Sequence, residues 1–349
     1  MEKRPLIGIM VRKRKQRRKI VKIYHHCKGD LTIQLFAFTP KDIDWENKRI
    51  DGGCFKNGQW VTETFRFPDV VYNRCYLKQG KTLQRLETYI GENKCFNSIT
   101  YFNKWEVYKL LSGTSLKKYL PDTLLYDPQA LMKQLKKNRQ LILKPCYGFQ
   151  GKRLYLLELT EDNQFKIYQD MLKPRYILRD EQSFLAKIAE LTSGRKYLMQ
   201  KKINLAKVEG KLADIRLLVQ KNRHGVWSVT NGISRIAYYS FFITNCSEKI
   251  MEMDTVLSTL FCDEAGKKSA TEDIHRIGVA ASKALESETG LLGETAIDLA
   301  IDEDGRIWII EINGKIQKSM YHHIEDKVSV DIDSVYKKPL EYAYYLSQQ

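Results

Sequence analysis

The sequence predicts an α+β fold of more than one domain, and three observations lead to this prediction. The chain has 349 residues, of which 43% are hydrophobic, so it can build the cores of two or three domains. Short apolar runs of strand length alternate with turn signals along most of the chain. Between them lie segments whose apolar residues recur at helical spacing, such as residues 183–191.

The composition indicates an anionic partner and a reducing environment. The net charge of +16 and the pI near 9.3 favour a nucleotide, a nucleic acid, an acidic peptide or an anionic polymer. No helix-turn-helix, zinc-finger or RNP pattern supports nucleic acid, which makes it the least favoured of these. The seven cysteines are scattered without a CxxC pair, which argues against a disulfide scaffold or a zinc ribbon. No apolar run reaches membrane-spanning length, so we expect a cytoplasmic protein.

The N-terminal part reads as a small α/β domain covering residues 1–95. Its predicted elements are strands at 6–11, 33–38 and 69–72, a hairpin turn at 56–59 and a helix at 82–90. The basic block RKRKQRRK runs from Arg12 to Lys19. We expect it to form an exposed loop, with an acidic partner or polymer as its possible ligand.

The remainder, residues 96–349, alternates helices and strands. A capping box at 269–272 is expected to open a long helix that Gly290 ends, and a short helix is expected near Leu340. The other predicted elements are helices at 105–111, 131–138 and 183–191 and strands at 141–145, 153–159, 197–200, 214–221 and 226–235.

Lys144 ends an apolar strand directly before a loop that carries Gly148 and Gly151. Glycines let backbone N–H groups approach a phosphate closely, and a neighbouring lysine supplies positive charge. The loop is not a P-loop, because no GK[ST] follows it. Taken alone, the loop is best interpreted as an ordinary glycine hairpin.

The most informative stretch is residues 294–317, which reads as two apolar strands around the turn DEDG. If the strands pair directly across this turn, Asp298 lies opposite Ile309 and diagonal to Glu311, within roughly 8 Å. Ile309, Glu311 and Asn313 then share one face. Unpaired carboxylates there would cost several kcal/mol, which a Mg²⁺ ion would remove. The alternative is a strand whose polar residues simply face water.

The order of these features resembles the ATP-grasp fold, and most of all its YheC/YheD-like, spore-coat-associated family. The resemblance rests on PDVVYNR, FNKW, LILKP, DIRLLVQKN, ISRIA and ExN, which follow one another as in that family. It implies a pre-ATP-grasp domain at 1–95 and an ATP-grasp domain at 96–349, whose two α+β subdomains enclose ATP. Arg216 and Arg235 would meet the γ-phosphate or a carboxyl substrate. The implied ligands are Lys104, Lys144, Gly148 and Gly151 for the phosphates, Gln200, Lys201 and Ile203 for adenine, and Asp298, Glu311 and Asn313 for Mg²⁺.

The resemblance also implies a reaction in which ATP phosphorylates a carboxylate and an amine or thiol then displaces the phosphate. Two departures favour an alternative, a spore-coat structural or assembly protein that keeps the fold without turnover. Residues 314–317 read GKIQ where many relatives carry Pro-Gly, and the stretch after Arg235 lacks the paired glycines of related sequences. Phe241 and Phe242 in that stretch are expected to be core or cover, and Cys146 a small packing residue.

Overall fold

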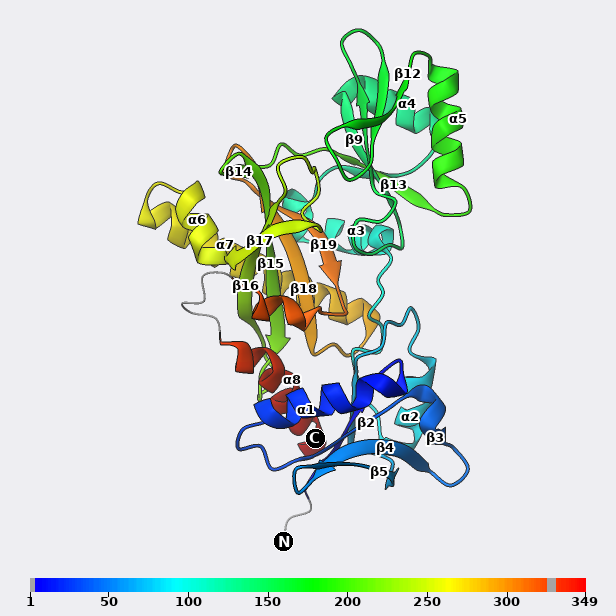
Figure 1. Ribbon diagram of the computed structural model, residues 1–349, viewed down its shortest axis with the longest axis vertical. Helices are drawn as coiled ribbons and strands as arrows, with labels where there is room; N and C mark the ends of the chain where they lie inside the picture. The colour runs from blue at the N-terminus through cyan, green and yellow to red at the C-terminus, as the bar shows by residue number, and fades with distance from the viewer. Residues whose placement is uncertain (1–3, 325–330) are drawn as a thin grey trace.

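The computed structural model describes residues 4–324 and 331–349, whose strands form three sheets along the long axis of the molecule (Figure 1). The first sheet lies at the N-terminal end, the third in the middle and the second at the opposite end. Each sheet has a core of its own, because apolar residues of its strands meet those of the helices that cover it.

The first sheet has the strand order β3-β4-β2-β1-β6-β7, with β5 paired to β4. Its centre is parallel, since β1 runs parallel to β2 on one side and to β6 on the other. All five residues of β1 are buried, as expected for a strand between two neighbours. The elements are β1 (Leu6–Met10), β2 (Gln34–Phe38), β3 (Ile43–Asp44), β4 (Arg49–Lys56), β5 (Gln59–Arg66), β6 (Val70–Asn73), β7 (Cys95–Phe96), α1 (Arg17–Cys27) and α2 (Lys81–Ile90).

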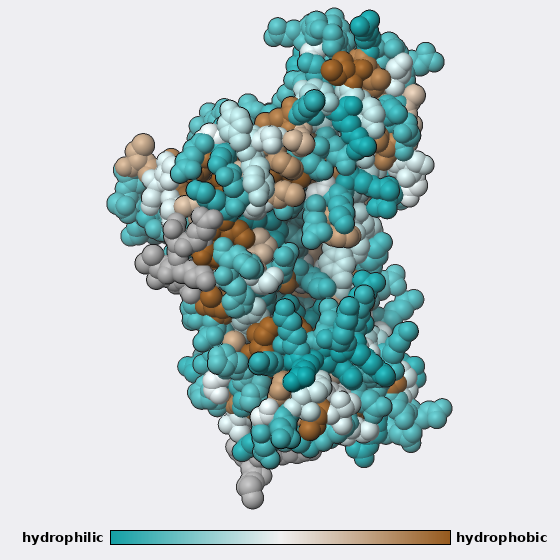
Figure 2. Space-filling view, viewed as in Figure 1, coloured by the Kyte–Doolittle hydropathy of each residue, from teal (hydrophilic) through white to brown (hydrophobic). Residues whose placement is uncertain are grey.

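The expectation of a loop from Arg12 to Lys19 is wrong beyond residue 13. A 3₁₀ turn, η1 (Arg14–Gln16), leads directly into α1. The helix forms because Val21, Tyr24 and Cys27 recur every three residues and are buried. The basic side chains take the outer face, and Figure 2 shows hydrophilic residues gathered over this region.

The second sheet has the order β12-β11-β10-β9-β13-β8, and α4 and α5 contribute apolar residues to its core. All its neighbouring strands run antiparallel. The predicted strand and glycine loop around Lys144 therefore lie in the middle of this sheet. The elements are β8 (Thr123–Leu125), α4 (Pro128–Asn138), β9 (Gln140–Pro145), β10 (Tyr155–Leu159), β11 (Phe165–Tyr168), β12 (Pro174–Leu178), α5 (Glu181–Thr192) and β13 (Tyr197–Lys201).

The third sheet has the order β17-β16-β15-β18-β19, with β14 paired to β15. The long helix α7 packs against β15, β16 and β18, and α3 contacts both α7 and β19. The elements are α3 (Lys104–Ser112), β14 (Lys207–Val208), β15 (Lys211–Lys221), β16 (Trp227–Ala237), β17 (Ser247–Glu252), α6 (Met253–Leu260), α7 (Glu264–Thr289), β18 (Glu294–Ile301) and β19 (Ile307–Asn313).

The predicted capping box at 269–272 is wrong, because these residues lie inside α7. The helix begins earlier, where the Asp263 carboxylate accepts a 2.7 Å hydrogen bond from the Gly266 amide. Gly290 ends the helix at φ +83°, as predicted.

The C-terminal helix α8 (Ile332–Gln348) is longer than the short helix expected near Leu340, and it joins two parts of the molecule. It packs against α1 and β6 of the first sheet and against β15 and β16 of the third. Figure 1 shows α8 beside α1, although they lie at opposite ends of the chain. No helix within the described residues is long and apolar enough to cross a membrane.

Candidate functional site

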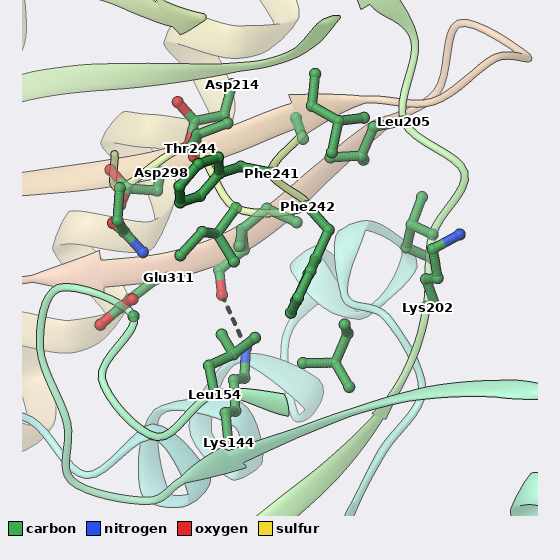
Figure 3. Close-up of a pocket in the computed structure, with 18 of the residues that line it drawn as sticks. Lys144, Leu154, Lys202, Leu205, Asp214, Phe241, Phe242, Thr244, Asp298 and Glu311 are labelled. Carbon is green, nitrogen blue, oxygen red and sulfur yellow. Dashed lines mark hydrogen bonds between the residues drawn. The ribbon is translucent and has the colours of Figure 1, made fainter. Parts of the chain in front are cut away.

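A cavity of about 550 Å³ opens between the second and third sheets, a size typical of ligand sites. Lys144 on β9 and Gln200 on β13 line it from the second sheet, and Asp298 on β18 and Glu311 on β19 line it from the third. In Figure 3, Lys144 and Leu154 lie across the cavity from Asp214, Thr244 and Asp298. The cavity therefore combines side chains from two separately folded layers.

Lys144 is a buried cation of this cavity, with 6% exposure. Its ammonium group donates to the Gln200 side-chain oxygen at 2.9 Å and to the Ile310 carbonyl at 3.3 Å. Burial and, to a smaller extent, the Lys104 charge lower the Lys144 pKa to about 8, against the opposing effect of Glu311. No carboxylate of the described residues lies within ion-pair distance of Lys144.

The glycine loop after β9 closes the cavity at one end. Gly148 and Gly151 both line it, and Gly151 has φ +66°, which favours glycine. A side chain at Gly148 would place its Cβ 2.9 Å from the Pro145 ring. The Lys104 ammonium group donates to the Gly148 carbonyl at 3.1 Å and lies 3.0 Å from a Glu311 oxygen. Lys104 thus ties the loop to the hairpin of β18 and β19.

The register of that hairpin differs from the prediction. Leu299 pairs with Ile309, but Asp298 pairs directly with Glu311, so Ile310 is the extra residue of a β-bulge. The bulge reverses the alternation, which leaves Ile309 and Ile312 together in the core under α7. The predicted shared face of Ile309 and Glu311 is therefore wrong, while the two carboxylates lie closer in register than expected.

Asp298 is buried and already paired, so the premise of unpaired carboxylates is wrong too. Arg216 holds it through two hydrogen bonds of 2.7 Å each, and an Arg235 nitrogen lies 3.2 Å away. Burial raises the Asp298 pKa, but Arg216 and Arg235 outweigh burial and keep it below its usual range. The Asn313 amide nitrogen lies 3.4 Å from an Asp298 oxygen.

Asp214 and Thr244 extend this network. Asp214 pairs with Arg235 across β15 and β16, and Arg235 Nε donates to it at 2.8 Å. The Thr244 hydroxyl donates to the same carboxylate. Arg235 is 3% exposed, so its charge is balanced inside the protein by Asp214 and Asp298.

The other end of the cavity is apolar. Ile203, Gln200 and Lys201, the residues that the resemblance assigns to adenine, all line the cavity, and the Gln200 amide donates to Thr123 Oγ1 at 2.9 Å. Phe241 and Phe242, expected to be core or cover, also line the cavity (Figure 3). The remaining apolar lining includes Ile142, Leu154, Leu172, Leu205 and Leu212.

The sequence profile described as YheC/D-like ATP-grasp matches residues 92–346 of the chain. The chain belongs to the YheC/D-like ATP-grasp family. Endospore coat-associated protein YheD of Bacillus subtilis (strain 168) is 27% identical over 328 residues, covering 90% of this chain and 71% of YheD. Endospore coat-associated protein YheC of the same organism is 24% identical over 326 residues, covering 90% of this chain and 88% of YheC.

Solved structures show that the three sheets form an ATP-grasp fold. The ATP-grasp ligase PsnB, in a complex with a precursor variant, Mg and ADP, superposes with a TM-score of 0.52 at 14% identity, covering 99% of both chains. The D-alanine–D-alanine ligase of Coxiella burnetii gives a TM-score of 0.55 at 13% identity, covering 99% of this chain and 95% of the ligase. The ATP-grasp fold is typical of ATP-dependent carboxylate–amine ligases.

The ATP-grasp fold raises the question whether Asp298, Glu311 and Asn313 suit a metal ion. No group of three or more His, Cys, Asp or Glu in the described residues could hold one. The set does offer two facing carboxylates and a neighbouring amide. That suits Mg²⁺, which keeps several waters and takes one or two carboxylates together with phosphate oxygens. The residues therefore fit Mg²⁺ accompanied by a nucleotide rather than a metal held by protein alone.

Sequence reasoning missed Asp214, Thr244 and Phe242 as cavity residues of this family member. Asp214 carried a signal, because it faces Arg235 if the hairpin between them pairs symmetrically. Thr244 and Phe242 lie in the irregular segment after β16, whose path no periodicity predicts. The cavity brings together every predicted cavity residue except Arg216 and Asn313, which reach it through Asp298.

Proposed function

We propose that this member of the YheC/D-like ATP-grasp family binds Mg-ATP in the cavity and uses it to activate a carboxylate for attack by an amine or a thiol. The observation that carries the proposal is Lys144, a buried ammonium group that meets only neutral oxygens within the described part of the chain. A structural lysine at such a depth is ordinarily paired with a carboxylate. An ATP phosphate would supply the missing negative charge.

The cavity's two ends suit the two ends of a nucleotide. The apolar end with Phe242 and Ile203 would take the base, with Gln200 and the Lys201 backbone at its edge. The glycine loop, Lys104 and Lys144 would hold the phosphates. Asp298, Glu311 and Asn313 would hold Mg²⁺, which offsets phosphate charge when bound.

Arg216 and Arg235 would then act on the transferred phosphoryl group or on the substrate carboxylate. Among the described residues, the one hydrogen-bond partner of Arg216 Nη1 is the Met320 sulfur at 3.3 Å, which is a weak acceptor. That N–H group can therefore turn to an incoming oxygen while Nε and Nη2 keep Asp298 in place. We assign these residues to charge stabilisation and positioning, because phosphoryl transfer needs little else from the protein.

Calorimetry with Mg-ATP tests this binding site. We expect saturable binding by the wild-type protein, at least tenfold weaker binding by Lys144→Met, and unchanged binding by Lys133→Met. Lys133 is an exposed residue of α4 and serves as the matched control. Absence of wild-type binding at millimolar Mg-ATP would contradict the proposal.

The second candidate is a spore-coat structural or assembly protein that keeps nucleotide binding without turnover. The names of YheD and YheC, both endospore coat-associated, favour it. So does the GKIQ segment at 314–317, where the family resemblance leads us to expect Pro-Gly. A phosphate-release screen with Mg-ATP against amino acids and short peptides separates the two, since only the ligase releases phosphate in a substrate-dependent way.

A further inference from the structure

A second polar surface lies where the first domain meets the end of β19. β1 and β6 are parallel neighbours, and the chain leaves β1 toward β2 on the opposite side. The carboxyl ends of such strands form a topological switch point, where α/β sheets commonly bind ligands. The segment after β19 covers this point, since Arg74 Nη2 lies 3.4 Å from the Ile316 carbonyl.

Three exposed cations surround this point, namely Arg12 after β1, Lys78 after β6 and Lys315 after β19, and we call them the junction cluster. No carboxylate of residues 4–324 or 331–349 is within ion-pair distance of any of them. The positive charges repel one another, and a bound anion would offset this repulsion.

Tyrosine rings hold two of these cations in place. The Lys315 ammonium group lies 5.7 Å from the centre of the Tyr76 ring, and that of Lys78 lies 4.0 Å from the centre of the Tyr147 ring. Tyr76 in turn stacks on Tyr101 at 4.3 Å. These contacts fix the ammonium groups without neutralising them, so their charge stays available to a ligand.

The junction cluster adjoins the phosphate end of the nucleotide cavity. Tyr76 packs edge-on against Phe149 of the glycine loop, with ring centres 6.3 Å apart, and Phe149 lines that cavity. Lys315 follows Asn313 of the proposed metal set by two residues. A ligand whose anionic group is bound by the junction cluster would therefore lie close to Lys104 and Glu311.

We propose that the junction cluster binds the carboxylate-bearing substrate of the reaction, and that this substrate is a peptide with several acidic side chains. The inference rests on the proposed function, because that reaction consumes a carboxylate at the phosphate end of the cavity. Cations on three separate segments fit several carboxylates along a chain better than a single one. The tyrosine rings add apolar contact area suited to a peptide backbone.

Fluorescence anisotropy with a labelled hexaglutamate peptide, without nucleotide and at 150 mM salt, tests the proposal. We expect the double variant Arg12→Ala, Lys315→Ala to bind about tenfold more weakly than wild type, a loss in keeping with two ion pairs. The double variant Lys133→Ala, Lys268→Ala removes the same charge from exposed sites elsewhere and should bind within twofold of wild type.

Three results would overturn the inference: no binding by the wild-type protein, equal losses in both double variants, or stronger binding of hexathymidylate than of hexaglutamate. The last would identify phosphates as the ligand. Calorimetry with Mg-ATP on the same proteins separates this test from that of the proposed function. The junction variant should keep its ATP affinity within twofold, and loss of ATP binding by the wild type alone would count against the proposed function.

Discussion

At the scale of single residues, the site depends on how charges are balanced before any ligand arrives. Asp298 is shared by Arg216 and Arg235, and Glu311 contacts Lys104. Lys144 has no carboxylate within ion-pair distance among the residues that the structure describes, and burial is the main cause that lowers its pKa to about 8. Asp298 and Glu311 stood out in the sequence because each interrupts an apolar strand, whereas Lys104, Lys144, Arg216 and Arg235 were expected from the resemblance to the ATP-grasp family. Which of these charged groups pair with one another could not be predicted, because the pairs join residues that are far apart in the sequence and meet only in the folded structure.

The lowered pKa of Lys144 predicts that ATP binding takes up protons. In the free protein Lys144 is partly neutral above pH 8, and phosphate charge beside it would raise its pKa, so binding at pH 8.5 should add protons to the protein. Calorimetry in buffers of different ionisation enthalpy measures this uptake. We expect the uptake to disappear in Lys144→Met; an unchanged uptake in the variant would show that another group titrates.

At the scale of elements, patterns of apolar residues predict strands and helices well, but they do not predict bulges or the first residues of helices. The strands around Lys144 and Asp298 lie where the sequence places them, but the extra residue Ile310 shifts the pairing of β18 and β19. The start of α7 was missed because Asp263, its true cap, precedes a segment without apolar periodicity. The start of α1 was missed for the same reason, because the basic block before Val21 has no apolar periodicity.

The turn after β19 has no room for a side chain, which gives a prediction for that element. A Cβ at Gly314 would lie 2.6 Å from the Phe102 ring and 2.9 Å from the Thr100 backbone. We expect Gly314→Ala to lower the free energy of unfolding by about 1–3 kcal/mol through overpacking. Urea unfolding measures the change, with Gly113→Ala as the control, because its Cβ would come no closer than 3.4 Å to a neighbour. Equal effects in both variants would refute the packing argument.

At the scale of the whole molecule, a buried ionic network joins the first sheet to the third sheet and the C-terminal helix. Glu294 on β18 contacts Arg74 at 3.2 Å and Lys318 at 2.8 Å, and accepts a 2.5 Å hydrogen bond from Tyr72 of β6. Lys318 also donates to the Val335 carbonyl of α8 at 2.8 Å. No motif in the sequence indicated this ionic network, because Tyr72 and Arg74 lie more than 200 residues before Glu294 in the chain.

Lys318 makes stability depend on pH. Burial lowers its pKa to about 7, although Glu294 opposes the shift, so between pH 7 and 9 the unfolded chain binds more protons than the folded one. The free energy of unfolding should therefore rise with pH in this window, by at most about 1.4 kcal/mol per pH unit from this group. Denaturant unfolding of wild type and Lys318→Met at several pH values measures it. A variant with the same slope as wild type would contradict the assignment.

We propose that the carboxylates of β18 and β19 hold Mg-ATP in this cavity, and thermal unfolding of Glu311→Gln with and without Mg-ATP tests this binding most directly. Ligand at one hundred times its Kd stabilises the folded state by about 2.7 kcal/mol, so the wild-type Tm should rise. We expect Glu311→Gln to lose most of that rise, and Glu288→Gln, an exposed control on α7, to keep it. A Glu311→Gln variant that keeps the full wild-type rise in Tm would contradict the account.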